Sequence, residues 1–155
     1  MPARPIKFGV TFGAAGAAQP WAAIRRFWQL LDRETVFDSA FTNDHFLPPF
    51  SDTGEVDPGI DNLEGIVTVA AGLEATERLR LGCLVMAVTY RHPGLVAKIA
   101  MTLDTLSGGR FELAIGAGWH ALEHRAYGVP FPPMGERQDR LEESAALLRT
   151  ILRAA

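Results

Sequence analysis

The feature that most constrains this chain is a fourfold alternation of short apolar runs with longer runs of helical periodicity. Strands are expected at residues 6–12, 37–42, 79–86 and 111–115, and helices at 21–31, 63–75, 93–107 and 137–153. Strands that alternate with helices predict a parallel sheet covered by helices. A complete (β/α)8 barrel needs about 250 residues, whereas this chain has 155. The pattern therefore predicts either a small doubly wound domain or the first half of a barrel.

The apolar spacing also predicts which helix residues face the core. In the last three helices these residues are Leu63, Ile66, Val67, Ala70 and Leu73, then Val96, Ile99, Ala100, Leu103 and Leu106, then Leu141, Ala145, Leu148 and Leu152. Gly108 and Gly109 follow the third helix directly, and a glycine commonly ends a helix in the left-handed conformation. We therefore expect the third helix to stop at residue 107.

Composition excludes several classes of protein. Apolar residues make up 48% of the chain and charged residues 21%, which is the balance of a folded globular domain. The formal charge of −3 offers no positive field for nucleic acid or an anionic membrane. No apolar run approaches the roughly 20 residues of a membrane helix. Cys83 is the single cysteine, which excludes an internal disulfide. We expect a soluble cytoplasmic protein.

Two long loops, 43–60 and 116–135, follow the second and fourth strands. They lie on the side of the sheet where the strands end, which is the face that carries the active site in both barrels and doubly wound domains. The first loop opens with Asn43, Asp44 and His45. An imidazole exchanges a proton near neutral pH, and a neighbouring carboxylate can orient it. His45 is therefore a candidate catalytic residue, and the alternative is a loop histidine without chemistry.

The string His120-Ala-Leu-Glu123-His124 has the HxxEH spacing of a zinc enzyme. On a helix the two histidines would share a face, and Glu123 could act as a base beside the metal. No convincing third ligand stands out in the residues that follow, so we expect no metal site. The alternative is a loop or short helix with two partly exposed imidazoles.

Gly116, Gly118 and Ala121 match the GxGxxA pattern of a dinucleotide-binding turn. That fingerprint belongs after the first strand of its fold, whereas here it follows the fourth. A Pro-rich run also comes where the crossover helix should continue. The alternative is a strand-end turn in which glycines let the chain bend over a ligand.

Two long segments carry a resemblance to a known family. Residues 37–46 (FDSAFTNDHF) and 79–143, which include LRLGCLVMAVTYRHP and GAGWHALEHRAYG, resemble the matching segments of the bacterial-luciferase-like superfamily. The closest branch is that of the coenzyme F420-dependent oxidoreductases. The resemblance runs from Lys7 to the C-terminus, with its blocks in the same order and spacing. It implies a TIM (β/α)8-barrel type of α/β fold, of which this chain holds the first four βα units, and it outweighs both short motifs.

The resemblance also implies an active site at the mouth of the barrel, where family members hold a flavin or deazaflavin ring. His45 matches an active-site histidine beside the ring. The Leu84–Val85 bond matches the place where relatives have a non-prolyl cis peptide behind the ring. The implied cofactor-binding residues are Asp44, Leu84, Val85, Ala87, Gly118, Trp119 and His120. One departure is that the sugar-phosphate dehydrogenases of this family carry an acidic Glu about where Trp119 stands.

By resemblance, the function is F420-dependent hydride transfer to or from a small organic substrate. An FMN-dependent monooxygenase of the same superfamily is one alternative, and a non-catalytic half-barrel is another. The single luciferase-like domain, residues 1–155, is expected to lack the fifth to eighth strands. The inward faces of FGVTF, LGCLVM and FELAI are then expected to meet water. Because open strand edges pair with other chains, we expect a homo-oligomer.

Overall fold

The computed structural model describes residues 6–11, 20–34, 36–47 and 62–154. Its elements are β1 (Gly9–Thr11), α1 (Trp21–Arg33), β2 (Ser39–Thr42), α2 (Gly65–Ala75), β3 (Arg80–Cys83), β4 (Met86–Ala87), α3 (Pro93–Ser107), β5 (Phe111–Glu112), β6 (Ile115–Gly116), α4 (Ala121–Ala126) and α5 (Met134–Ala154). Most of the loop expected at 43–60, and the last residue of the strand expected at 6–12, lie outside the described residues. No helix within these ranges is both long enough and apolar enough to span a bilayer.

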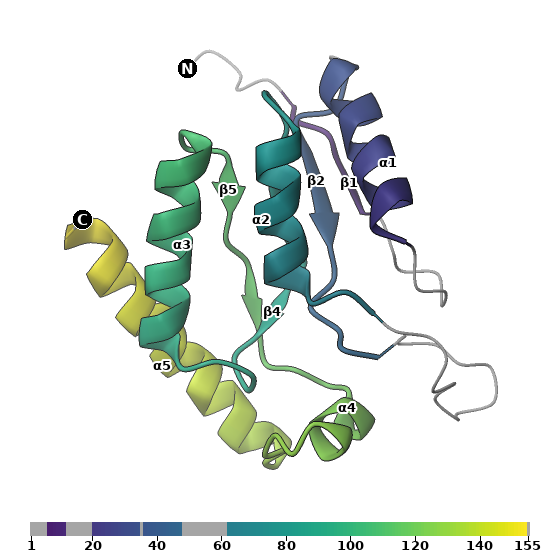
Figure 1. Ribbon diagram of the computed structural model, residues 1–155. Helices are drawn as coiled ribbons and strands as arrows, with labels where there is room; N and C mark the ends of the chain where they lie inside the picture. The colour runs from purple at the N-terminus through teal and green to yellow at the C-terminus, as the bar shows by residue number, and fades with distance from the viewer. Residues whose placement is uncertain (1–5, 12–19, 35, 48–61, 155) are drawn as a thin grey trace.

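The strands follow one another across a parallel sheet in the order β1-β2-β3-β5. Figure 1 shows α1, α2 and α3 side by side along one side of this sheet, with α5 crossing obliquely beside α3. A doubly wound domain would instead reverse its strand order and place helices on both faces. The prediction of a barrel half is confirmed, and the chain is a partial (β/α)8 barrel.

Two of the four expected strands are each divided in two. The third becomes β3 and β4, separated by a turn at Leu84 and Val85, and the fourth becomes β5 and β6. β4 and β6 pair with each other in a second small parallel sheet. The peptide bond between Leu84 and Val85 is cis, which confirms the prediction at that position. The division bends both strands at the end of the sheet where the long loops begin.

The core lies between the sheet and its helices. One row of side chains in register across the sheet faces the helices: Val10, Ala40, Leu81 and Phe111. Trp28 of α1 is fully buried and packs over Gly72 of α2, where an added Cβ would stand 2.2 Å from the Trp28 ring. Cys83 is also fully buried, at the end of β3. Close contact of α1 and α2 therefore depends on the absence of a side chain at Gly72.

The sheet face away from the helices is more polar than expected. Successive strand residues point to opposite faces, so the row in register next to the core row belongs to this second face. That row consists of Thr11, Phe41, Gly82 and Glu112. Glu112 forms an ion pair with Arg80 of the adjacent strand. The expectation that the inward faces of FGVTF, LGCLVM and FELAI meet water therefore applies to a row of mixed polarity, because Val10, Leu81 and Phe111 lie on the helix side. The apolar side chains of these segments that do meet water include Phe8, Leu84 and Val85, which are 55%, 50% and 41% exposed.

Four helix residues expected in the core are exposed, namely Leu63, Val67, Leu106 and Leu152. In α2, Ile66 and Leu73 are buried as expected, and Val69 and Gly72 are buried in addition. This helix is apolar on nearly all sides, so apolar spacing alone does not identify its buried face. The end of α3 is as expected, because Gly108 adopts the left-handed conformation with φ of 67°.

Candidate active site

A cavity of about 330 Å³ opens where β2, β4 and β6 end. All eight residues predicted for the site line this cavity: Asp44, His45, Leu84, Val85, Ala87, Gly118, Trp119 and His120. Tyr90, Gly116 and Ala117 complete the lining. Residues that are up to 76 positions apart in sequence are therefore brought together at the end of the sheet that the loop lengths indicated.

The floor of the cavity is apolar and depends on two glycines. Leu84 and Val85, at the turn between β3 and β4, are 50% and 41% exposed and present their side chains to the cavity. A Cβ on Gly116 would lie 2.5 Å from Val85, and one on Gly118 would lie 2.9 Å from the Thr89 hydroxyl. Gly118 also has a positive φ of 77°, which a side chain disfavours. These glycines let the loop after β6 approach the turn closely.

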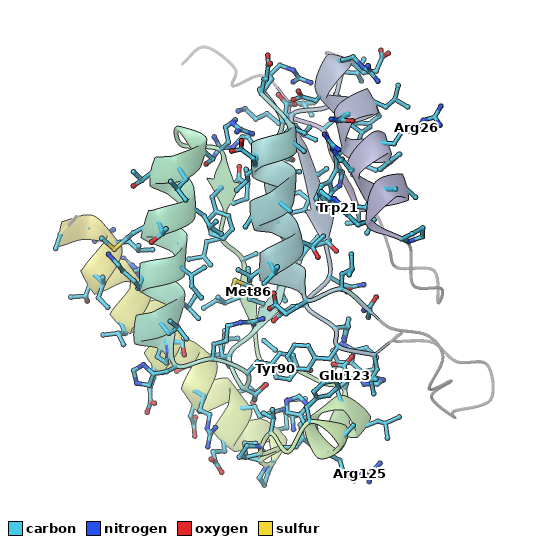
Figure 2. All side chains as sticks on the ribbon, viewed as in Figure 1. Trp21, Arg26, Met86, Tyr90, Glu123 and Arg125 are labelled. Atoms are coloured by element: carbon cyan, nitrogen blue, oxygen red, sulfur yellow. The ribbon has the colours of Figure 1, made fainter. Side chains whose placement is uncertain are left out.

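His45 is held by a buried carboxylate on α4. Its Nδ1 lies 3.0 and 3.1 Å from the two oxygens of Glu123. Glu123 also accepts hydrogen bonds from the backbone N–H of Leu47, at 3.1 Å, and from the Tyr90 hydroxyl. Figure 2 shows Tyr90 and Glu123 approaching each other below the sheet, while Arg125 of the same helix points outward. Glu123 therefore joins α4 to the loops after β2 and β4.

The surroundings of Glu123 favour its charged form. Burial alone raises the pKa of a carboxyl group, but hydrogen bonds from His45, Tyr90 and Leu47 lower the pKa of Glu123 below its ordinary value. Burial and the adjacent carboxylate both raise the pKa of Tyr90. Tyr90 therefore remains a neutral donor beside an ionised acceptor.

The two histidines of the HxxEH string have different environments. His124 is fully buried, which corrects the expectation of a partly exposed imidazole. Its Nε2 contacts the Thr89 hydroxyl at 2.7 Å, and its Nδ1 contacts the His120 carbonyl at 2.9 Å. His120 lines the cavity, and its buried Nδ1 has no hydrogen-bond partner among the described residues. Burial lowers the pKa of His120, so this imidazole is predominantly neutral at pH 7.

The string does not form a metal centre in this arrangement. Within the described ranges no three His, Cys, Asp or Glu side chains are grouped so that they could share an ion. His124 is turned toward Thr89, and Glu123 toward His45. The zinc-enzyme interpretation of the HxxEH spacing is therefore not supported by the positions of these side chains.

Asp44 lines the cavity but is occupied by protein contacts. It accepts two hydrogen bonds from Arg91, at 2.7 and 2.8 Å, and one from the Ala87 backbone N–H, at 3.0 Å. Arg91 also forms an ion pair with Glu64, the N-cap residue of α2. Burial raises the pKa of Asp44, and the nearby Glu64 adds to this, while Arg91 and Ala87 oppose it. This cluster fixes β4 against the ends of β2 and α2.

Trp119 is 54% exposed at the rim of the cavity. Its ring meets the His45 ring edge-on, with centroids 5.3 Å apart. An indole offers only an N–H donor, so it does not reproduce the acidic Glu that the family resemblance implies near this position. Trp119 instead provides an aromatic wall beside His45.

Sequence reasoning missed Tyr90 as a site residue, and it considered Glu123 only as a base beside zinc. Tyr90 lies in the segment 89–93 between the third strand and the following helix, where only the basic groups of Arg91 and His92 suggested a ligand. A signal was available for Glu123, because an acidic residue in the loop after the fourth strand lies on the same face as His45. The spacing of 78 residues between the two could be interpreted only after the topology was known.

The chain is similar in sequence to curated proteins. An F420-dependent glucose-6-phosphate dehydrogenase of Beutenbergia cavernae is 34% identical over 125 residues, covering 80% of this chain and 35% of the relative. The chain spans about a third of the length of the curated relatives it matches.

Two solved structures are similar in fold. An F420-dependent secondary alcohol dehydrogenase in complex with an F420-acetone adduct has a TM-score of 0.74 at 23% identity, covering 93% of this chain and 42% of the other. The FMN-bound oxygenating constituent of 3,6-diketocamphane monooxygenase from Pseudomonas putida has a TM-score of 0.69 at 18% identity, covering 92% and 38%. A profile described as luciferase-like monooxygenase matches residues 6–155. With a match over nearly its whole length, the chain belongs to the luciferase-like monooxygenase family.

Proposed function

We propose that the chain carries part of the active site of an oxidoreductase that transfers a hydride between coenzyme F420 and a small organic substrate. The observation that carries the proposal is a cavity with an apolar floor in which a buried carboxylate holds the His45 imidazole. Several relatives at 30–40% identity are named F420-dependent glucose-6-phosphate dehydrogenases. The substrate of this chain is proposed only as a small organic molecule, because Trp119 differs from the residue expected in the sugar-phosphate enzymes.

The cavity fits part of a deazaflavin or flavin. Ligand pockets commonly measure about 300–1,000 Å³, and this cavity of about 330 Å³ is at the lower end of that range. Leu84, Val85 and Ala87 would form the wall behind a flat aromatic ring. The buried Nδ1 of His120 has no hydrogen bond among the described residues, although it lies 3.6 Å from Oε1 of Glu123, and it could meet a polar edge of the ligand. We propose that Asp44 acts by holding the Ala87 backbone and that Gly118, Trp119 and His120 border the ring.

The chemistry that bound F420 supplies is hydride transfer, and the protein contributes orientation, exclusion of water and a proton relay. His45 is placed to move a proton at the cavity, where groups of this kind contribute about 100- to 10,000-fold in rate. The apolar floor excludes water from one side of the cavity. The cluster of Asp44, Arg91 and Glu64 keeps that floor in position.

A flavin-dependent monooxygenase is the second candidate function. It is supported by the structural similarity to the FMN-bound monooxygenase, and the described cavity has no feature that distinguishes the two ring systems. A chain that binds neither cofactor would favour the third interpretation, a half-barrel without catalytic function. We further propose that residues 1–155 form one domain, that it acts in the cytoplasm as a homo-oligomer, and that nucleic acid is not a partner.

A fluorescence titration of the 155-residue chain with F420, and in parallel with FMN, tests the cofactor. The phosphate site of a barrel commonly follows strands seven and eight, which these four units do not include, so we expect weak F420 binding. L84E, which puts a charge on the cavity floor, should abolish it. L95E adds the same charge at an exposed position of α3 and should preserve it. Equal binding of F420 by L84E and L95E would contradict the proposed site. Tighter binding of FMN than of F420 would favour the monooxygenase.

A rate measurement tests His45 in a complete barrel of this family that contains the segment. His45→Ala should lower turnover by about 100-fold or more if the imidazole relays a proton. A rate within about twofold of the parent enzyme would remove His45 from the mechanism.

A further inference from the structure

We propose that Glu123 is the positioning residue of this site: it fixes a proton on Nδ1 of His45 and leaves Nε2 as the nitrogen that exchanges a proton with the cavity. The inference rests on the proposed function, in which His45 relays a proton. It adds the residue that determines which ring nitrogen does so. Glu123 itself acts through His45 and does not line the cavity.

The contacts of Glu123 require a proton on Nδ1. An ionised carboxylate only accepts hydrogen bonds, and Nδ1 of His45 lies within 3.1 Å of both of its oxygens. An unprotonated Nδ1 would place its lone pair against a negative charge in a buried setting. The imidazole therefore carries its proton on Nδ1, either in the neutral ring or in the cation.

The remaining contacts keep Glu123 ionised. The side chain is fully buried, which by itself favours a neutral carboxyl group. The Leu47 backbone N–H and the Tyr90 hydroxyl each donate to it in addition to His45. Hydrogen bonds to the charged form favour that form, and the pKa of Glu123 is lowered as a result.

The surroundings of the His45 ring leave Nε2 available. No described residue forms a hydrogen bond with that nitrogen. The ring is flanked by Trp119 and His120, with centroids 5.3 and 5.8 Å away. Of the other charged groups nearby, Asp44 is held by Arg91. Glu123 is therefore the carboxylate that determines the tautomer of His45. A free histidine ring prefers its proton on Nε2, and Glu123 reverses that preference at this position.

A purely structural role for Glu123 is the competing explanation, because its bond to Leu47 ties α4 to the loop after β2. E123Q separates the two explanations. The carboxamide has the same shape and can still accept from Leu47. It can also turn its NH₂ group toward His45. A donor at that place favours an unprotonated Nδ1, which accepts the hydrogen bond, and so moves the ring proton to Nε2.

Nitrogen-15 NMR of the imidazole rings at a pH where they are neutral is the test. The chain has four histidines, and the His45 signals are those missing in H45N. In the wild-type chain we expect the Nδ1–H tautomer of His45 to predominate. In E123Q we expect the majority of the population to move to the Nε2–H tautomer. E112Q removes a carboxylate that pairs with Arg80 on the open sheet face, and it should leave the His45 spectrum unchanged.

Each outcome decides the proposal. A predominant Nε2–H tautomer in the wild-type chain would overturn it without any variant, so the proposal remains testable if E123Q fails to fold. An unchanged His45 tautomer in folded E123Q would assign Glu123 to structure alone. The readout does not depend on the cofactor. A chain with the expected tautomers that binds no F420 would refute the proposed function and preserve the inference, and the reverse result would refute only the inference.

Discussion

At the residue scale, the site is arranged around two buried ionised side chains, Arg91 and Glu123. Arg91 is 12% exposed in its side chain and compensates the nearly fully buried Asp44. Glu123 organises three donors from separate segments of the chain. Each buried ion is stabilised by its charged or hydrogen-bonding partners. Removal of a partner therefore leaves an uncompensated charge in the protein interior, which solvates it poorly.

R91M is therefore expected to destabilise the chain by about 3–5 kcal/mol, because it leaves the nearly fully buried Asp44 without its cation. Urea unfolding followed by circular dichroism measures the change. R140M is the matched control, since it removes an arginine that pairs with Glu136 on the exposed face of α5, and it should cost less than about 0.5 kcal/mol. Similar costs for the two variants would show that the Asp44 cluster is effectively solvated.

Residue-level prediction from sequence succeeded where a polar residue follows an apolar strand. His45 and Asp44 stand out for that reason, and both line the cavity. The partners that give them their properties could not be identified in this way. Glu123 meets His45, and Tyr90 meets Glu123, only once the second, third and fourth βα units are assembled, and no local pattern encodes those contacts.

At the element scale, the packing of α1 on α2 depends on one small residue. G72A should destabilise the chain by about 1–3 kcal/mol, because the added methyl group would stand 2.2 Å from the ring of Trp28. The midpoint of urea unfolding is the measurement. G135A is the control, since Gly135 in α5 has open space around it, and alanine there should raise stability by about 0.4–1 kcal/mol. A G72A chain as stable as the parent would mean that the two helices separate without cost.

A second contact between elements predicts a pH dependence. The Asp32 carboxylate, near the end of α1, accepts from the backbone N–H groups of Glu77, Arg78 and Leu79. Burial opposes its charge, but these hydrogen bonds lower the pKa of Asp32 below the ordinary 3.8. A lowered folded-state pKa contributes stability that is present above the unfolded pKa and lost as the pH falls through the folded value.

D32N should therefore cost about 1 kcal/mol near neutral pH, similar to the loss of a helix cap. The difference from wild type should shrink as the pH falls below about 4. Urea unfolding across pH provides the comparison. D139N, at an exposed position of α5, should follow the wild-type curve throughout. A D32N deficit that persists unchanged in acid would show that the charge of Asp32 is not the stabilising factor.

The order and type of the elements could be predicted from sequence because each βα unit has its own period and its own stop signal. Gly108 illustrates this, since its left-handed conformation ends α3 where the sequence indicated. The buried face of α2 could not be predicted, because Val67 and Val69 are equally apolar, yet Val69 is fully buried and Val67 is 68% exposed. The breaks within the third and fourth strands follow from the bend at the cavity, which no propensity indicates.

At the scale of the whole molecule, the partial barrel has two open sides. Within the described residues β1 pairs with β2 alone and β5 with β3 alone. Unpaired backbone N–H and C=O groups on such strands are templates for another chain. The open sheet face is largely polar, so the edges are the better candidates for association than the face.

The 155-residue chain is accordingly expected to self-associate, with a sedimentation coefficient that rises with concentration. T11K places a charge on the exposed β1 edge and should weaken association, since lysine on an edge strand opposes pairing. T102K adds the same charge on α3, away from both edges, and should not. A chain that sediments as a monomer at every concentration and melts cooperatively would show that the four units are self-sufficient.

The burial of Cys83 lets the rate of thiol labelling report how often the structure opens around this residue. This thiol is the only one in the sequence, it is fully buried at the end of β3, and burial raises its pKa well above the ordinary value. Alkylation requires the thiolate and access to it, so a reagent can react only during the moments when α2 lifts away from the sheet. The rate at which a label accumulates under native conditions therefore counts those openings, without any engineered reporter.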